Sequence, residues 1–201
     1  IDRVTSPYPP SWYAASVASL PSQPTLTGDI DADVCILGAG YVGLSTALEL
    51  AEAGYKVVVL EAERIGWGAS GRNGGQVLFG FGCGESKLVS LLGRDDARKL
   101  FDWSCEGVRL IHERRDRYGI DCDWREGHAT VAIKPRQIVE LQTWQRELEQ
   151  DYDYSMSWWD REQLRGQLDS PRYLGGLYDP NAGHLHPLRY ALGLGRAAIG
   201  A

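Results

Sequence analysis

Three glycines at a fixed spacing form the strongest chemical signal in this sequence. Gly38, Gly40 and Gly43 lie in the run Gly-Ala-Gly-Tyr-Val-Gly, between a short apolar segment and a segment with helical spacing. In such a motif the first glycine makes a tight turn, the second lets a pyrophosphate approach the backbone, and the third lets the helix lie close to the strand. The N-terminus of the helix then directs free N–H groups towards the phosphates. The motif predicts a dinucleotide-binding site, although a glycine-rich turn in an unrelated α/β protein is the alternative.

An acidic residue follows at the spacing of a ribose site. Glu61 comes 23 residues after Gly38, at the end of a second apolar run. A carboxylate at this point accepts hydrogen bonds from both hydroxyls of an adenosine ribose and disfavours a 2′-phosphate. This much of the pattern fits NAD and FAD equally.

A second glycine-rich segment, residues 66–76, separates these two cofactors. After its second strand, a nicotinamide dehydrogenase normally continues into an ordinary helix, whereas this chain continues into Gly-Trp-Gly-Ala-Ser-Gly-Arg-Asn-Gly-Gly-Gln. Bare backbone can run along a second large, flat group and donate N–H groups to a pyrophosphate, and Ser70 adds a hydroxyl. The segment favours FAD, and a mobile surface loop is the alternative interpretation.

A strand–helix–strand unit is needed to position these motifs. The apolar runs at 34–37 and 56–60 predict buried parallel strands, and the spacing of residues 41–53 predicts the helix between them. Residues 1–29 predict a proline-rich, irregular arm. The remaining expected elements are a helix at 95–118, strands at 122–125 and 128–134 joined as a hairpin through Glu126 and Gly127, a helix at 136–150, a strand at 156–158, a helix at 161–168, a strand at 173–178 and a helix at 187–198.

Residues 38–62 and 68–76 resemble the FAD-dependent amine and amino-acid oxidoreductases of the D-amino-acid oxidase superfamily. The runs Trp-Tyr-Ala-Ala-Ser at 12–16 and Gly-His-Leu-His-Pro at 183–187 are similar to its γ-glutamylputrescine oxidoreductase branch. The resemblance implies an α/β fold with a Rossmann-type FAD-binding lobe (30–119 and 185–201), the arm, and the start of an α+β substrate lobe (120–184). Because relatives are about twice as long, we expect a fragment of the N-terminal half that is inactive by itself.

The resemblance also implies a set of cofactor contacts. It places Gly38, Gly40 and Gly43 at the pyrophosphate and Glu61 at the ribose. Ala62 and Arg64 would lie near the adenine. The residues expected to bind FAD are Gly38, Ala39, Gly40, Tyr41, Val42, Gly43, Glu61, Ala62, Arg64, Ala69, Ser70, Arg72, Asn73, Gly74, Gly75 and Gln76. Arg72 is equally well explained as part of a surface ion pair. His184 and His186 are candidates for positions near the flavin, with metal binding as the weaker alternative, and no catalytic residue can be assigned.

The reaction implied by the resemblance is oxidation of a C–N bond. A hydride passes from the carbon that carries the amine to flavin N5, with oxygen as the expected acceptor. The substrate is then a small-molecule amine that resembles γ-glutamylputrescine or an amino acid. A dinucleotide-binding module or subunit without turnover is the alternative from another functional class, and an NAD-linked dehydrogenase is disfavoured by residues 66–76.

Composition excludes several other functions. The 201 residues carry a net charge of −6 with a pI of about 5.2, which argues against a nucleic-acid-binding protein and against a basic membrane-surface protein. No apolar run approaches the ~20 residues that span a bilayer, and no signal peptide opens the sequence. Cys35, Cys83, Cys105 and Cys122 show no metal-binding spacing. We therefore expect a cytoplasmic protein with reduced thiols.

Overall fold

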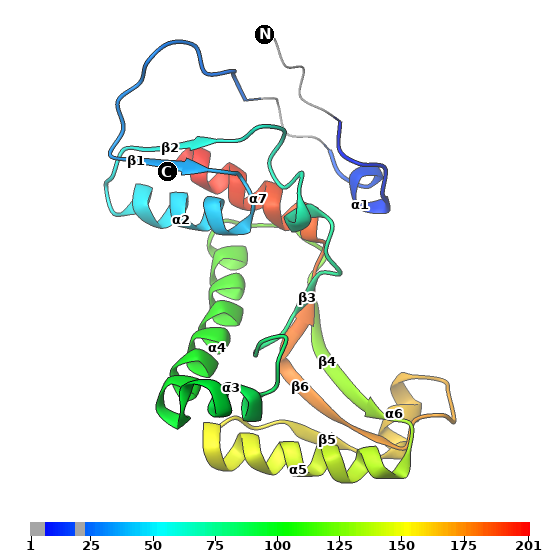
Figure 1. The fold of residues 1–201 in the computed structure, drawn as a ribbon. Helices are drawn as coiled ribbons and strands as arrows, with labels where there is room; N and C mark the ends of the chain where they lie inside the picture. Colours follow the sequence, from blue (N-terminus) through cyan, green and yellow to red (C-terminus); the bar gives the residue numbers. More distant parts are fainter. Residues whose placement is uncertain (1–6, 19–22) are drawn as a thin grey trace. The chain divides into compact units, whose positions relative to one another are not determined.

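The computed structural model describes residues 7–18 and 23–201 and divides into two compact units. The first comprises Ile1–Gly75, Ile111–Trp124 and Leu185–Ala201, and the second comprises Gln76–Leu110 and Arg125–His184. Residues 76–110 thus group with the second unit, whereas the division expected from the sequence assigned them to the FAD-binding lobe. Figure 1 labels the elements of both units.

The first unit is built on a parallel strand–helix–strand arrangement, which confirms the expected α/β class. Strands β1 (Val34–Leu37) and β2 (Val57–Leu60) pair in parallel, with Val34 opposite Val57 and Leu37 opposite Leu60. Helix α2 (Tyr41–Glu52) connects them and buries Leu44, Ala47 and Leu48, because residues three and four apart share one helix face. This arrangement brings the Gly38–Gly43 segment to the carboxyl end of β1.

Helix α7 (Pro187–Gly200) lies beside α2 in the same unit (Figure 1). Gly193 and Gly195 allow this helix to lie close to its neighbours, because a Cβ at either position would overlap the side chain of Ile120 or Ile65 respectively. The short helix α1 (Trp12–Ala15) of the arm also contacts α7. The C-terminal end of α4 (Arg94–Arg117) belongs to this unit, where Arg114 donates hydrogen bonds to Ser45 and Glu49 of α2.

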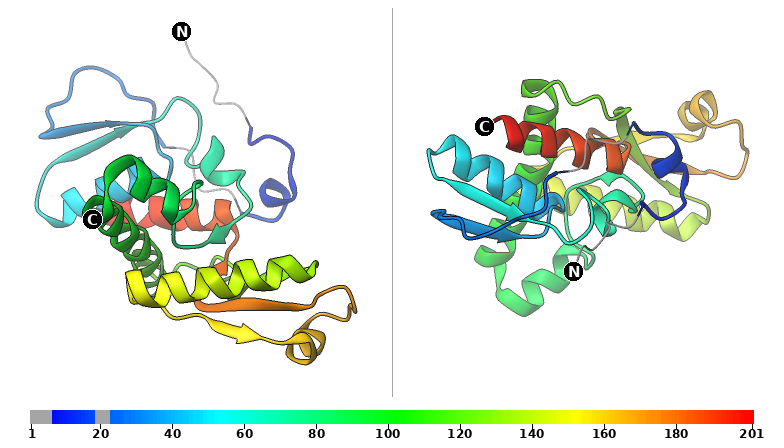
Figure 2. Two further views of the ribbon diagram at one scale, coloured as in Figure 1. Left: turned by 60° about the horizontal axis from the view of Figure 1, so that its bottom comes forward. Right: turned by 90° about the horizontal axis from the view of Figure 1, so that it is seen from above.

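The second unit contains an antiparallel sheet centred on β6 (Gly175–His184). Strand β4 (Arg125–Ala132) pairs along one edge of β6, while β3 (Gln76–Val77) and β5 (Ser157–Trp159) pair with opposite ends of its other edge. The turned views show α5 (Pro135–Tyr152) running along this sheet (Figure 2). Helices α3 (Glu85–Leu92) and α6 (Arg161–Gln167) and the first part of α4 complete the unit.

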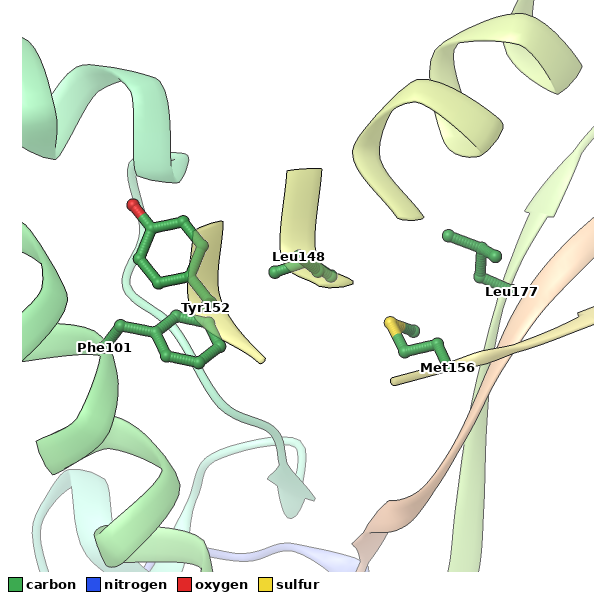
Figure 3. Packing of buried hydrophobic residues seen from close by; sticks show 5 residues of the cluster. All are labelled: Phe101, Leu148, Tyr152, Met156 and Leu177. Carbon is green, nitrogen blue, oxygen red and sulfur yellow. The ribbon is translucent and has the colours of Figure 1, made fainter. Parts of the chain in front are cut away.

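An apolar cluster holds α4, α5 and the sheet of the second unit together. Its buried members are Phe101, Leu148, Tyr152, Met156 and Leu177, shown in Figure 3. The rings of Phe101 and Tyr152 are 4.4 Å apart between centroids, within the range in which aromatic pairs attract. Removing this buried apolar area from water is the main stabilising contribution to the unit.

The expected hairpin at 122–134 is wrong. Residues 121–124 form no strand, and β4 runs continuously through Glu126 and Gly127, with an irregularity in its register between Glu126 and His128. Gly127 has a φ of +86°, and a Cβ there would overlap the Tyr178 ring, so this glycine accommodates a bulge within one strand. Helix α3 and strand β3 were not expected, and the arm, expected to be irregular, contains the short helix α1. Strand β6 extends well beyond the expected strand at 173–178. The other expected elements agree with the structure to within about two residues at each end.

Candidate functional site

The first glycine segment joins β1 to α2 in a compressed turn. Gly38 has a φ of +100°, a conformation that favours glycine, and its N–H donates to the carbonyl of Leu60 at 2.7 Å. A Cβ at Gly43 would overlap the carbonyl oxygen of Gly38, so the third glycine lets the first turn of α2 lie directly on the loop. The first N–H groups of α2, which have no partner within the helix, therefore lie at the end of β1.

Glu61 lies next to this turn, immediately after β2. Its carboxylate accepts hydrogen bonds from the backbone N–H groups of Ala39 at 2.7 Å and Glu63 at 2.9 Å. Both contacts fix the direction of the side chain, which is nevertheless exposed and accessible to a ligand. Although Glu61 comes 23 residues after Gly38 in the sequence, its side chain contacts the glycine segment directly.

The second glycine segment lies against the first. Ser70, within the short 3-10 helix Ala69–Gly71, accepts a hydrogen bond from the backbone N–H of Tyr41 at 3.0 Å. A Cβ at Gly40 would lie 2.9 Å from Ser70 Oγ. The N–H of Gly66 donates to the carbonyl of Ala39 at 2.9 Å. The two segments that sequence reasoning singled out therefore meet at the N-terminus of α2.

The first turn of α7 completes this arrangement through backbone contacts that the sequence does not reveal. The Tyr41 hydroxyl donates to the carbonyl of Pro187 at 3.0 Å and accepts a hydrogen bond from Asn73 at 3.4 Å. Leu185 donates its N–H to the carbonyl of Gly75 at 2.9 Å. Burial raises the pKa of Tyr41 to about 12, so its hydroxyl remains a hydrogen-bond donor at neutral pH. We call the Gly38–Gly43 turn, Glu61, residues 66–75 and this turn of α7 the cradle.

Several expected site residues lie at the surface of the cradle. Val42 is 81% exposed in the first turn of α2, and Ala62, Ala69 and Gly74 are exposed too. Arg72 is also exposed, but its guanidinium lies over the Trp67 ring and donates to the carbonyl of Gly68 at 3.1 Å. Within residues 7–18 and 23–201, Arg72 thus forms no ion pair.

The two histidines of the 183–187 run have different surroundings. His184 is the last residue of β6 in the second unit, exposed and opposite Gln76 of β3. His186 belongs to the first unit, is 3% exposed, and caps α7 by accepting the N–H of Arg189 on Nδ1 at 3.1 Å. Over residues 7–18 and 23–201, no group of three or more histidine, cysteine or acidic side chains could hold a metal ion.

The second unit has a cavity of about 450 Å³ that sequence reasoning missed. Phe79 and Trp144 line it together with Glu85 and Asp179. Asp179 is 2% exposed and accepts a hydrogen bond from the Tyr154 hydroxyl at 2.8 Å. Burial, together with this contact, raises the pKa of Tyr154 above its usual value. The run Asp-Pro-Asn at 179–181 is typical of a turn, so the sequence offers no signal for a buried carboxylate here.

The cradle meets the requirements of a dinucleotide. It combines a helix N-terminus that suits a pyrophosphate, bare backbone at Gly40, and a carboxylate beside this turn that suits a ribose. Its walls come from both glycine segments, which a site for a long, bent cofactor needs. Among the described helices, none is long and apolar enough to cross a membrane.

Known proteins resemble most of this chain. Residues 33–201 match the family described as FAD dependent oxidoreductase (DAO). The probable oxidoreductase OrdL of Haemophilus influenzae is 48% identical over 177 residues, which are 88% of this chain and 41% of that protein. The gamma-glutamylputrescine oxidoreductase of Escherichia coli is 44% identical over 183 residues, or 91% and 43% of the two chains. The chain thus spans less than half the length of these relatives, and the expected resemblance to this branch is confirmed.

Solved structures show the same fold. The L-amino acid deaminase of Proteus myxofaciens, in complex with anthranilate, superimposes with a TM-score of 0.70 at 21% identity, over 89% of this chain and 39% of that one. Glycine oxidase from Bacillus cereus gives a TM-score of 0.59 at 24% identity, over 84% and 45%. The family match decides between the two cofactors that the glycines leave open: the chain belongs to the FAD dependent oxidoreductase family.

Proposed function

We propose that this chain supplies the cofactor-binding part of an enzyme that oxidises the C–N bond of a small amine. The observation that carries the proposal is the meeting of the two glycine segments at the Tyr41–Ser70 hydrogen bond, beside Glu61. The gamma-glutamylputrescine oxidoreductase of Escherichia coli, at 44% identity, supports an amine as the substrate class. We therefore expect a substrate that resembles γ-glutamylputrescine or an amino acid.

Each part of the cradle has a separate task in this proposal. The turn from Gly38 to Gly43 holds the pyrophosphate on the first N–H groups of α2. Glu61 binds the ribose hydroxyls, with Ala62 and Arg64 near the adenine. Ser70 and Asn73 keep the second glycine segment against Tyr41, so that the backbone of Gly74 and Gly75 runs along the cofactor. Gln76, the next residue, begins β3 and belongs to the second unit.

The chemistry of the proposed reaction belongs to the cofactor. FAD bound in the cradle would supply the hydride acceptor for the carbon that carries the unprotonated amine, and oxygen is the proposed final acceptor. The residues of this chain bind and orient it: the first turn of α2 supplies the positive end of a helix dipole, and Glu61 fixes the sugar. Tyr41, kept protonated by burial, holds α7 against the cradle through Pro187.

The test is an amine panel supplied to the full-length protein. The panel contains γ-glutamylputrescine, free putrescine, glycine and D-alanine, and two signals are recorded separately: anaerobic bleaching of the flavin absorbance and aerobic release of hydrogen peroxide. We expect γ-glutamylputrescine to bleach the flavin faster than free putrescine. If the flavin bleaches but no peroxide is released, oxygen is not the acceptor, and the proposed oxidation of an amine still stands. A flavin-loaded protein that no amine reduces would refute amine oxidation.

A matched variant separates cofactor loss from general damage. Asp160 caps α6 in the second unit and takes no part in the cradle, so Asp160→Ala perturbs the fold without touching the proposed FAD contacts. We expect this variant to load with FAD as the wild type does. If FAD loading fell equally in Asp160→Ala and in a cradle variant such as Gly40→Ala, the amount of bound FAD would reflect the stability of the fold and not contacts with the cofactor.

A further inference from the structure

Two runs that are far apart in the sequence meet around His186. Ser16 Oγ lies 3.0 Å from His186 Nε2, and the rings of Trp12 and Tyr13 lie 5.4 and 4.9 Å from the imidazole between centroids. Arg189 strengthens the junction by donating to the carbonyl of Ser16 at 3.0 Å. The arm helix α1 is thus fastened to the first turn of α7 through a buried histidine.

The contacts of His186 define its protonation state. Nδ1 accepts the N–H of Arg189, so this nitrogen carries no hydrogen, and in the neutral ring Nε2–H then donates to Ser16 Oγ. The backbone N–H of His186 donates to the carbonyl of Cys122 at 2.7 Å. A proton on Nδ1 would place two donors face to face and add a positive charge at the positive end of the α7 dipole.

The charged and titratable groups around the imidazole come from each neighbouring element. Arg189 lies on α7, Tyr13 on α1, and Cys122 and Asp123 on the segment before β4, where Asp123 pairs with Arg189 at 2.8 Å. Asp123 acts mainly on Arg189, because the two form a direct ion pair. Burial, followed by the charge of Arg189, lowers the pKa of His186 below its ordinary value.

The turn that His186 caps is part of the cradle wall. Leu185 and Pro187, on either side of the histidine, bind Gly75 and Tyr41 through backbone groups. The next residue, Leu188, packs on the second glycine segment. A Cβ at Gly71 would lie only 2.9 Å from Leu188 Cδ1. A shift of this turn would therefore move the contacts that hold the two glycine segments together.

We propose that His186, in its neutral form, is a positioning residue of the cofactor site, fastening the N-terminal arm to α7 and holding the cradle in its binding arrangement. The inference rests on the proposed assignment of FAD to the cradle. If docking of the arm favours FAD binding, FAD binding must favour docking of the arm by the same factor.

The pH dependence follows from the direction of the pKa shift. Because the folded protein lowers the pKa of His186 below about 6.5, the value in the unfolded chain, the neutral side chain stabilises the junction fully above that pH. The stabilisation is lost as the pH falls through the lower pKa of the folded state. Loss of an N-cap corresponds to a roughly five-fold change in an equilibrium constant.

Hydrogen exchange of the arm tests the junction without relying on activity. Amide protection of residues 7–18 is measured by mass spectrometry on the full-length protein without FAD, between about pH 5 and pH 8, with correction for intrinsic exchange rates. We expect protection to fall about five-fold in the acidic half of this range. His186→Asn keeps a capping oxygen that does not titrate, so its protection should be lower overall but independent of pH. Asp160→Ala, which removes only the cap of α6 in the second unit, should keep the pH dependence of the wild type.

FAD binding provides the second readout. The Kd for FAD, measured by flavin fluorescence, should rise about five-fold over the same acidic range in the wild type and stay flat in His186→Asn. Saturating FAD should increase protection of residues 7–18 at neutral pH. The inference would be overturned if arm protection or FAD affinity of the wild type did not change with pH. It would also be overturned if His186→Asn showed the same pH dependence as the wild type. A protein that binds no FAD at any pH would instead refute the proposed function. The exchange data, measured without FAD, would still test whether His186 holds the arm against α7.

Discussion

Substitution of two glycines in the same turn separates cofactor binding from folding. Gly40 has φ and ψ angles of −86° and −174°, which an alanine can adopt, and its added Cβ would approach closely only Ser70 Oγ, the movable end of a side chain. A Cβ at Gly43 would instead overlap the carbonyl oxygen of Gly38, which belongs to the backbone and cannot rotate away. Gly40→Ala should therefore leave the fold intact, whereas Gly43→Ala should damage it.

The magnitudes follow from these contacts. In Gly40→Ala, Ser70 rotates and its hydrogen bond to Tyr41 is lost, which costs about 1 kcal/mol. The reduced entropy of the unfolded chain offsets about 0.4–1 kcal/mol of this. In the proposed site, however, the new methyl group would stand between the backbone and the pyrophosphate. Loss of one charge-assisted hydrogen bond, about 1.5–3 kcal/mol, raises the Kd for FAD about ten- to hundred-fold. Overpacking in Gly43→Ala costs about 1–3 kcal/mol of stability.

The assay compares FAD affinity with the melting temperature of the FAD-free full-length protein. Gly40→Ala should bind FAD weakly and melt within about 3 °C of the wild type, and Gly43→Ala should melt about 2–10 °C lower. Gly40→Ala combined with Ser70→Ala removes the hydroxyl that the new Cβ meets, but should not restore FAD affinity. Wild-type FAD affinity in Gly40→Ala would refute the reasoning, because the pyrophosphate could not then lie on this turn.

Three further substitutions test other parts of the account. Glu61→Gln keeps one oxygen for the backbone N–H of Ala39 but loses the charge that strengthens the ribose contact, so FAD affinity by titration should fall about ten-fold; an unchanged Kd would contradict the ribose assignment. Asp160→Ala removes the α6 cap that accepts the N–H of Gln163, so urea unfolding should show a loss of about 1 kcal/mol. Phe101→Ala opens a cavity in the cluster of the second unit and should cost about 3–5 kcal/mol in the same assay; a loss below about 1 kcal/mol would mean that the cluster is not tightly packed.

The parts of the fold that could be predicted from the sequence are those with local causes. The apolar run at 34–37 and the spacing of Leu44, Ala47 and Leu48 are periodic patterns that can be recognised in a short window. The first glycine segment and Glu61 share a fixed spacing because β1, α2 and β2 form one continuous unit. Their mutual contact therefore followed from the order of the elements.

The parts that could not be predicted depend on contacts between distant segments. Glu126-Gly127 is typical of a hairpin turn, but Gly127 is a bulge because β4 pairs with β6, some fifty residues later in the chain. The first turn of α7 reaches the cradle through backbone carbonyls, whose positions no side-chain pattern reveals. His186 could be singled out by type, but its task as a buried cap beneath the arm depends on Ser16, which lies 170 residues away.

A crystal structure of the full-length protein with FAD tests the central claim most directly. We predict that the pyrophosphate lies on the backbone N–H groups at the N-terminus of α2, beside Gly40, and that the ribose hydroxyls bind Glu61. A pyrophosphate held elsewhere, with Glu61 still bound only to its backbone neighbours, would contradict it.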